Sequence, residues 1–118
     1  SVECRLYCEN TIQIDDLATA THLYRIAQEA VGNALRHAEP TRIDIELADR
    51  TDLFSLSIRD NGCGIPDEVG SGNGMGFNIM RYRARMIDAS LDITSGPEGG
   101  TFVTCKFHNR RDTDVGGP

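Results

Sequence analysis

The chain has 118 residues, 39% of them apolar and 25% charged, which suits one globular domain with one hydrophobic core. Its formal net charge of −6 argues against a broad electrostatic footprint on nucleic acid or an anionic membrane. A small phosphate ligand remains compatible with this charge, because backbone amides and a metal ion can hold it. No apolar run could span a bilayer and no signal peptide opens the chain, so we expect a cytoplasmic domain without direct membrane contact.

The first expected element is a strand over residues 2–8, in which alternate side chains share one face: Val2, Cys4, Leu6 and Cys8. We expect its two cysteines to be small buried side chains in a reducing compartment. Cys63 is expected in a loop, and Cys105 in a later strand. The four cysteines form no paired C-x-x-C motifs, so they do not suggest a zinc site.

A long helix follows. Asp15 and Asp16 offer N-caps, and Pro40 ends the helical pattern. Between them, apolar residues recur at helical spacing and form one stripe: Leu23, Ile26, Ala27, Ala30, Val31, Ala34 and Leu35.

Two alternating segments come next, separated by a turn at residues 50–52. Residues 41–48 place Ile43, Ile45 and Leu47 on one face, and residues 53–60 place Phe54, Leu56 and Ile58 inward. The period of two also places Asp60 on the inward face, at the end of its strand. A carboxylate at this position is not expected to be an ordinary solvent-exposed surface group.

Residues 61–74 predict a loop, and a second helix is expected from about Gly76 to Asp88, burying Ile79, Met80, Ala84 and Ile87. Strands over 90–95 and 101–107 flank a "GPEGG" turn, and the last strand faces inward with Thr101, Val103, Cys105 and Phe107. Residues 109–118 read as a flexible tail after a domain over 1–108. We therefore expect an α+β fold: a two-layer α/β sandwich whose mixed, mostly antiparallel sheet has hairpin-like neighbours and helices on one face.

Polar side chains could form a ligand site beside this helix and these strands. Glu29, Asn33 and His37 stack along one face of the long helix at i, i+4 and i+8, with Arg36 beside them. Glu and Asn supply the oxygen ligands that magnesium accepts, and the two basic residues suit phosphate oxygens. Alone, such a row is more typical of a solvated helix face.

Asp60 could accept a hydrogen bond from an exocyclic amine such as that of adenine, although an ordinary D-N-G turn is the simpler reading of this segment. Gly62 and Gly64 would let the backbone approach a flat ring. The glycines of "GSGNGMGF", from Gly70 to Phe77, could present amides to an anion, yet they fit neither a P-loop nor a Rossmann fingerprint. The acidic stretch before them suits a mobile lid.

These signals in this order resemble the ATP-binding catalytic domain of sensor histidine kinases, in the superfamily that includes gyrase, Hsp90 and MutL. "HLYRIAQEAVGNALRHA" looks like the N box, "DNGCGIP" the G1 box, "GNGMGF" the G2 box and "GGT" the final glycine–threonine element. The wording of the long helix and of "GMGFNIMRYRA" is similar to the nitrate-sensor type of these kinases. The resemblance runs from about Val2 to Phe107 and implies the Bergerat ATP-binding fold.

The resemblance also implies residue roles. Asn33 would hold a magnesium ion on the phosphates of ATP, and Glu29 would orient or activate the attacking group. Phosphate contacts would come from Arg36 and His37, with Asn78 as a further candidate. Asp60 would bind the adenine amine with support from Thr101, and Gly62 and Gly64 would pass beneath the ring. The lid would close on its glycines: Gly72, Gly74 and Gly76.

The chain has three histidines, His22, His37 and His108, and none lies in a phosphoacceptor context. The phenylalanine-bearing box found in other branches of the sensor kinases is also missing. The resemblance therefore implies an excised, monomeric catalytic domain that serves a histidine-bearing dimerisation domain and, downstream, a response regulator. Whether the parent protein is membrane-anchored stays open. A serine kinase of the anti-sigma type, or a domain that only binds nucleotide or partner proteins, are the alternatives.

Overall fold

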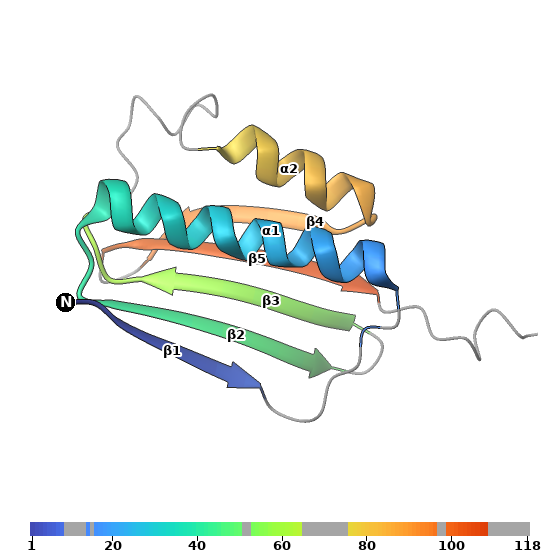
Figure 1. The fold of residues 1–118 in the computed structure, drawn as a ribbon, viewed down its shortest axis with the longest axis horizontal. Helices are drawn as coiled ribbons and strands as arrows, with labels where there is room; N and C mark the ends of the chain where they lie inside the picture. The colour runs from blue at the N-terminus through green and yellow to red at the C-terminus, as the bar shows by residue number, and fades with distance from the viewer. Residues whose placement is uncertain (9–13, 15, 51–52, 65–75, 97–98, 109–118) are drawn as a thin grey trace, which may run out of the picture.

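Two layers make up the structure, a five-stranded sheet and helices that cover one of its faces (Figure 1). This computed structural model describes residues 1–8, 14, 16–50, 53–64, 76–96 and 99–108, with only the backbone at position 50. The expected turns at 50–52 and 96–100 are therefore described only in part, and the tail at 109–118 lies outside the described residues. The α+β sandwich expected from the sequence is confirmed.

The sheet has the strand order β1-β2-β3-β5-β4. Its strands are β1 (Glu3–Cys8), β2 (Arg42–Arg50), β3 (Leu53–Asp60), β4 (Ser90–Ser95) and β5 (Thr101–His108). The expectation of hairpin-like neighbours holds for β2–β3 and β4–β5, which are antiparallel. β1 runs parallel to β2, which makes the sheet mixed as expected, and β3 pairs with β5 rather than with the next strand in sequence.

The pairing of β3 with β5 positions the site. Arg59 lies opposite Phe102 in the antiparallel register. Asp60 ends β3 and Thr101 begins β5, so both residues come next in that register, at one end of the sheet. Two side chains 41 positions apart in sequence therefore become neighbours through the topology of the sheet.

Helix α1 (Leu17–Asn33) begins at Asp16, whose Oδ1 accepts the Ala18 N–H at 3.2 Å and whose Oδ2 accepts the Thr19 hydroxyl at 2.8 Å. Asp16 is thus the N-cap, whereas Asp15 lies outside the described residues. The helix continues as a π-helical turn, η1 (Ala34–Ala38), before Glu39 adopts a left-handed conformation ahead of Pro40. Helix α2 (Phe77–Met86) is the second cover, and no described helix is both long and apolar enough to cross a bilayer.

The core lies between these helices and the sheet. Its largest fully buried side chains are Phe54, Phe107, Ile26, Ile43, Met80 and Cys105. Two residues expected in it are exposed, Leu35 by 54% and Ile79 by 53%. Leu35 falls in the wider π turn, where the angular step per residue is smaller than in an α-helix. Helix α2 instead packs through Phe77, Met80 and Ala84, a face that leaves Ile79 outside.

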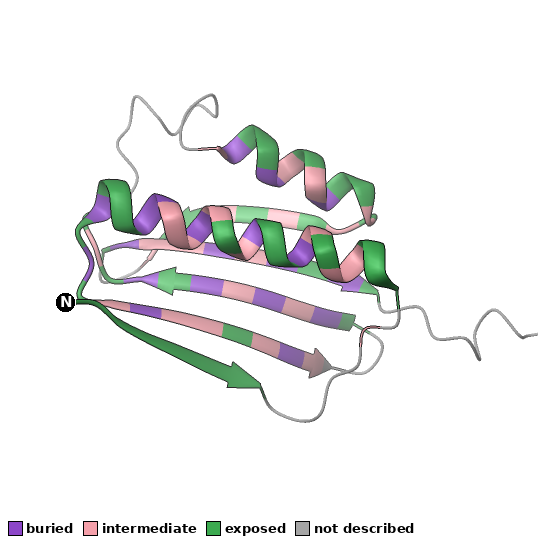
Figure 2. Cartoon of the chain, viewed as in Figure 1, coloured by how far each residue is buried: buried purple, intermediate pink, exposed green. Residues whose placement is uncertain are grey.

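Every residue of β1 is exposed, as Figure 2 shows along the whole strand. The expectation that Cys4 and Cys8 are buried is therefore wrong. Their strand does alternate, and Leu6 pairs with Ile45 of β2, but β1 is the edge strand and its inward side chains gain no helix above them. Cys105, on the interior strand β5, is buried as its pattern predicts.

Candidate functional site: a cleft between the first helix and the sheet

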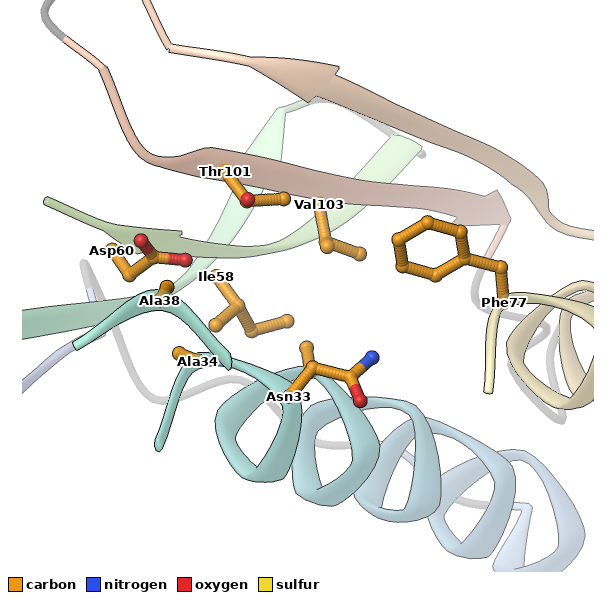
Figure 3. Close-up of a pocket in the computed structure, with 9 residues that line it drawn as sticks. Asn33, Ala34, Ala38, Ile58, Asp60, Phe77, Thr101 and Val103 are labelled. Carbon is orange, nitrogen blue, oxygen red and sulfur yellow. The ribbon is translucent and has the colours of Figure 1, made fainter. Parts of the chain in front are cut away.

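A narrow cleft separates the end of α1 from the sheet and contains about 340 Å³ of space, its open mouth included. Figure 3 shows Asp60 and Thr101 at one end of the cleft and Phe77 at the other, with Asn33 on the helix side. The remaining lining side chains are small or aliphatic: Ala30, Ala34, Ala38, Ile58 and Val103.

Asp60 brings a carboxylate into this apolar space and is only 6% exposed. Its Oδ1 accepts the Gly62 N–H at 2.8 Å, which fixes the orientation of the side chain. Within the described part of the chain, Oδ2 accepts no hydrogen bond and the Thr101 hydroxyl is not bonded to it. One acceptor oxygen therefore remains for a donor that enters the cleft beside Thr101.

The turn after Asp60 packs against the end of the long helix. A Cβ at Gly62 would overlap the backbone of Ala38, and the Cys63 N–H donates to Ala38 O at 2.9 Å. The glycine is thus required by the approach of two backbone segments, and not only by the approach of a ring. Gly64 lies next, facing the backbone of Gly100.

Asn33, the second buried polar residue, lies where α1 changes into η1 and is 6% exposed. Its Oδ1 accepts the Arg36 Nη2–H at 3.0 Å, and the same nitrogen lies 3.3 Å from Glu29 Oε2. The structure therefore joins three of the four polar helix residues predicted for the site. A guanidinium, a buried amide and a carboxylate form one connected cluster on the helix.

His37, the fourth, is not joined to them: its side chain makes no hydrogen bond within the described residues, and its carbonyl oxygen accepts the Cys63 Sγ–H at 3.5 Å. The π turn after Asn33 explains the difference, because the spacing of i+4 no longer closes one turn there.

Gly76 links the cluster to the second helix. It precedes α2 with φ of 69°, and a Cβ there would overlap the Glu29 carboxylate. The N-terminus of α2 thus lies against an acidic side chain, an arrangement favoured by the helix dipole. Asn78 is in the first turn of α2 and is exposed, whereas Gly72 and Gly74 lie outside the described residues.

Sequence reasoning missed several residues that shape the cleft. Phe77 closes one end, and the alanines of η1 form the helix wall. Gly32, inside α1, was also passed over: a Cβ there would come within 2.8 Å of Arg36 Nη1. A glycine in a helix interior is itself a signal, since it weakens the helix by about 1 kcal/mol relative to alanine.

The cluster suits a hydrated cation better than a cation bound by protein groups alone. Among the described residues, no group of three or more His, Cys, Asp and Glu side chains could hold a metal ion. Magnesium is commonly held by one or two protein oxygens together with phosphates and water. Asn33 Oδ1 is an oxygen of the kind that could take that role, and it accepts a hydrogen bond from the positively charged Arg36.

Residues 18–111 match the family described as histidine kinase-, DNA gyrase B-, and HSP90-like ATPase. The chain belongs to this ATPase family. The match covers α1, the cleft and all strands except β1, so the assignment rests on the part of the chain that builds the site.

Two relatives with similar sequences are sensor proteins. The nitrate/nitrite sensor protein NarX of Escherichia coli K12 is 35% identical over 99 residues, and the sensor protein VraS of Staphylococcus saprophyticus is 41% identical over 95 residues. These alignments cover 83% and 80% of this chain. The chain spans only 17% and 27% of the lengths of those two relatives.

Two solved structures have the same fold. The ATP-binding domain of PrrB from Mycobacterium tuberculosis superposes with a TM-score of 0.78 at 19% identity, covering 93% of this chain and 82% of that one. The histidine kinase domain of the blue-light activated kinase of Erythrobacter litoralis gives a TM-score of 0.74 at 22% identity, covering 92% and 52%. The likeness confirms the Bergerat-type sandwich expected from the sequence.

Proposed function

We propose that the chain is the ATP-binding catalytic domain of a two-component sensor histidine kinase, which transfers the γ-phosphate of ATP to a histidine on a separate dimerisation domain. The observation that carries this proposal is the cleft. It places a buried carboxylate beside Thr101 at one end and a buried amide with a cationic partner on the helix side. The sensor relatives favour this function over a serine kinase of the anti-sigma type.

Asp60 would select the purine. Its Oδ2 would accept a hydrogen bond from the exocyclic amine of adenine, while the bond from the Gly62 N–H holds the carboxylate in place. Apolar side chains on both walls, such as Ile58 and Ala34, would contact the two faces of the ring. A buried acceptor discriminates strongly against a ligand without the matching donor, because the acceptor would then be left unpaired.

The helix cluster would bind the phosphates. Asn33 would hold a magnesium ion, which when bound neutralises charge on the phosphate oxygens. Arg36 is 58% exposed in its side chain and long enough to turn toward a phosphate, with His37 nearby in sequence. Glu29 pairs with Arg36 and touches Gly76, contacts that suit positioning of the site better than removal of a proton.

Transfer would need a second domain. A histidine nitrogen forms the bond to the γ-phosphorus as the bond to the bridging oxygen breaks and ADP leaves. The domain's part is to position the phosphates and to stabilise their charge, which is most of what phosphoryl transfer requires from a protein. We infer a cytoplasmic, monomeric domain, with a response regulator receiving the phosphoryl group afterwards.

Replacing Asp60→Asn tests this function. The amide oxygen can still accept the Gly62 N–H, so the fold is retained, but an amide NH₂ facing the adenine amine sets donor against donor. We expect ATP affinity measured by calorimetry to fall at least about 100-fold. Asp92→Asn, on exposed β4, is the matched control and should bind ATP as the wild type does. Equal affinity of the Asp60 variant and the wild type would refute the adenine assignment.

A further inference from the structure

We propose that Arg36 is a built-in counter-cation, which occupies the magnesium-binding oxygen of Asn33 in the nucleotide-free domain and must leave it before the metal ion can bind. This inference rests on the proposed function. It adds a competition between an arginine of the chain and the metal ion, and this competition sets how strongly ATP binding depends on magnesium.

The contacts define the competition. Arg36 Nη2 lies 3.0 Å from Asn33 Oδ1 and 3.3 Å from Glu29 Oε2. The guanidinium and the metal ion are both positively charged, so they repel each other when both lie against this one amide oxygen. The Asn33 side chain is buried and only 6% exposed, so it has little room to move. Arg36 is more than half exposed, so the arginine is the group that can move.

Gly32 provides a second, independent observation in favour of the contact between Arg36 and Asn33. It is a glycine inside α1, where alanine would favour the helix. A Cβ at this position would come 2.8 Å from Arg36 Nη1, the other terminal nitrogen of the guanidinium. The missing side chain thus leaves the space in which the guanidinium lies against Asn33.

Gly32→Ala therefore offers a sharp test, because it retains Arg36 but disfavours its position on Asn33. The quantity to measure is the ratio of ATP dissociation constants without and with saturating Mg²⁺, which is the coupling between the two ligands. We expect the ratio to rise about three- to tenfold in Gly32→Ala, the size of one partly exposed charged hydrogen bond. Calorimetry with ATP, in EDTA and in excess Mg²⁺, gives both constants.

Two controls keep the interpretation specific. Arg25→Gln removes an exposed arginine from the same helix, where it bonds Gln28, and should leave the ratio unchanged. In an Asn33→Ala background the contested oxygen is gone, so adding Gly32→Ala should change nothing further. An effect of Gly32→Ala that persists in that background would contradict the proposal, since it would not pass through Asn33.

The possible results of these measurements distinguish this inference from the proposed function on which it rests. A wild-type domain that binds no ATP would refute the proposed function itself. Normal ATP binding with the same magnesium ratio in wild type and Gly32→Ala would refute only the role of Arg36 as a competitor. Circular dichroism and melting of each variant establish that the binding data come from folded protein.

Discussion

Asp60 and Asn33 are the two buried polar side chains in the described part of the chain, and both line one cleft. Burying a polar group destabilises a fold unless the group is hydrogen-bonded. Asp60 accepts the Gly62 N–H and Asn33 accepts a hydrogen bond from Arg36, and both side chains line the cleft in which a ligand would lie. Their shared position in one cleft therefore supports the binding role proposed for them.

Asp60 could be placed from sequence because strand alternation continues to the last residue of β3. Gly62 was expected to be small for the sake of a ring, whereas the structure gives a different reason, its contact with Ala38. That contact joins residues 24 positions apart, and the spacing of residues in one segment cannot reveal it. The pairing of Arg36 with Asn33 is local to one helix, but its geometry depends on Gly32 and on the turn that follows.

Cys105 should behave unlike the other three cysteines. Burial raises the pKa of its thiol to about 11, so the reactive thiolate is scarce and inaccessible. We expect Ellman's reagent at pH 8 to modify the three exposed thiols of the native protein quickly, and Cys105 only after unfolding. Four rapidly reacting thiols would contradict the buried position of Cys105, and Cys63→Ser should remove one of the three fast equivalents.

The same thiol should make the folded protein less stable in alkali. Its folded pKa lies above the ordinary value of 9.0, so the folded state favours the neutral form. The stability that this preference contributes is complete below pH 9 and is lost as the pH rises toward 11.

The sequence predicts the N-terminal end of α1 well and its C-terminal end poorly. Its N-terminus follows from side-chain chemistry within four residues, and Asp16 caps it as the sequence predicts. Its C-terminus changes into the π turn η1, which packs against the turn after β3. No local pattern marks that change, and the burial of Leu35 was wrongly predicted because helical spacing was carried through it.

Asp16→Ala should lower the melting temperature by a few degrees at pH 7, because the Ala18 N–H and the Thr19 hydroxyl lose their acceptor. The bonds from Thr19 and Ala18 hold the Asp16 pKa below its ordinary value of 3.8. The contribution of the carboxylate is therefore present above that pH and disappears as the pH falls through the lowered pKa. Melting curves of wild type and variant should converge in acid, and a gap that stays constant with pH would contradict this cap.

On the scale of the whole molecule, the layers could be predicted and the order of the strands could not. Alternating and helical periods identify which segments are strands and which are helices. They do not show that β5 inserts between β3 and β4, or that β1 lies at an edge beyond the helices. The exposure of Cys4 and Cys8 follows from this order alone, because their own strand has the pattern that was predicted.

Substitutions at the centre of the sheet should destabilise the fold strongly, whereas substitutions on the edge strand β1 should have little effect. Phe54 and Phe107 pair across β3 and β5 with ring centroids 5.7 Å apart, and both are almost fully buried. Phe54→Ala should lose about 3–5 kcal/mol of the free energy of unfolding, a large part of the ~5–15 kcal/mol typical of a domain. Leu6→Ala, at 74% exposure on β1, should change it by less than about 0.5 kcal/mol. Urea titrations followed by circular dichroism give both values, and similar losses would contradict the placement of β1.

Apart from Asn33, the helix wall of the cleft consists of the methyl groups of Ala30, Ala34 and Ala38. A nucleotide with an enlarged base would need a wider cleft. Alanine side chains on the helix wall cannot usefully be shortened to provide it. The extra room must come from the opposite wall, where Ile58 and Val103 are the side chains that can be shortened. An orthogonal version of the protein would therefore be engineered on the strands, leaving the helix untouched.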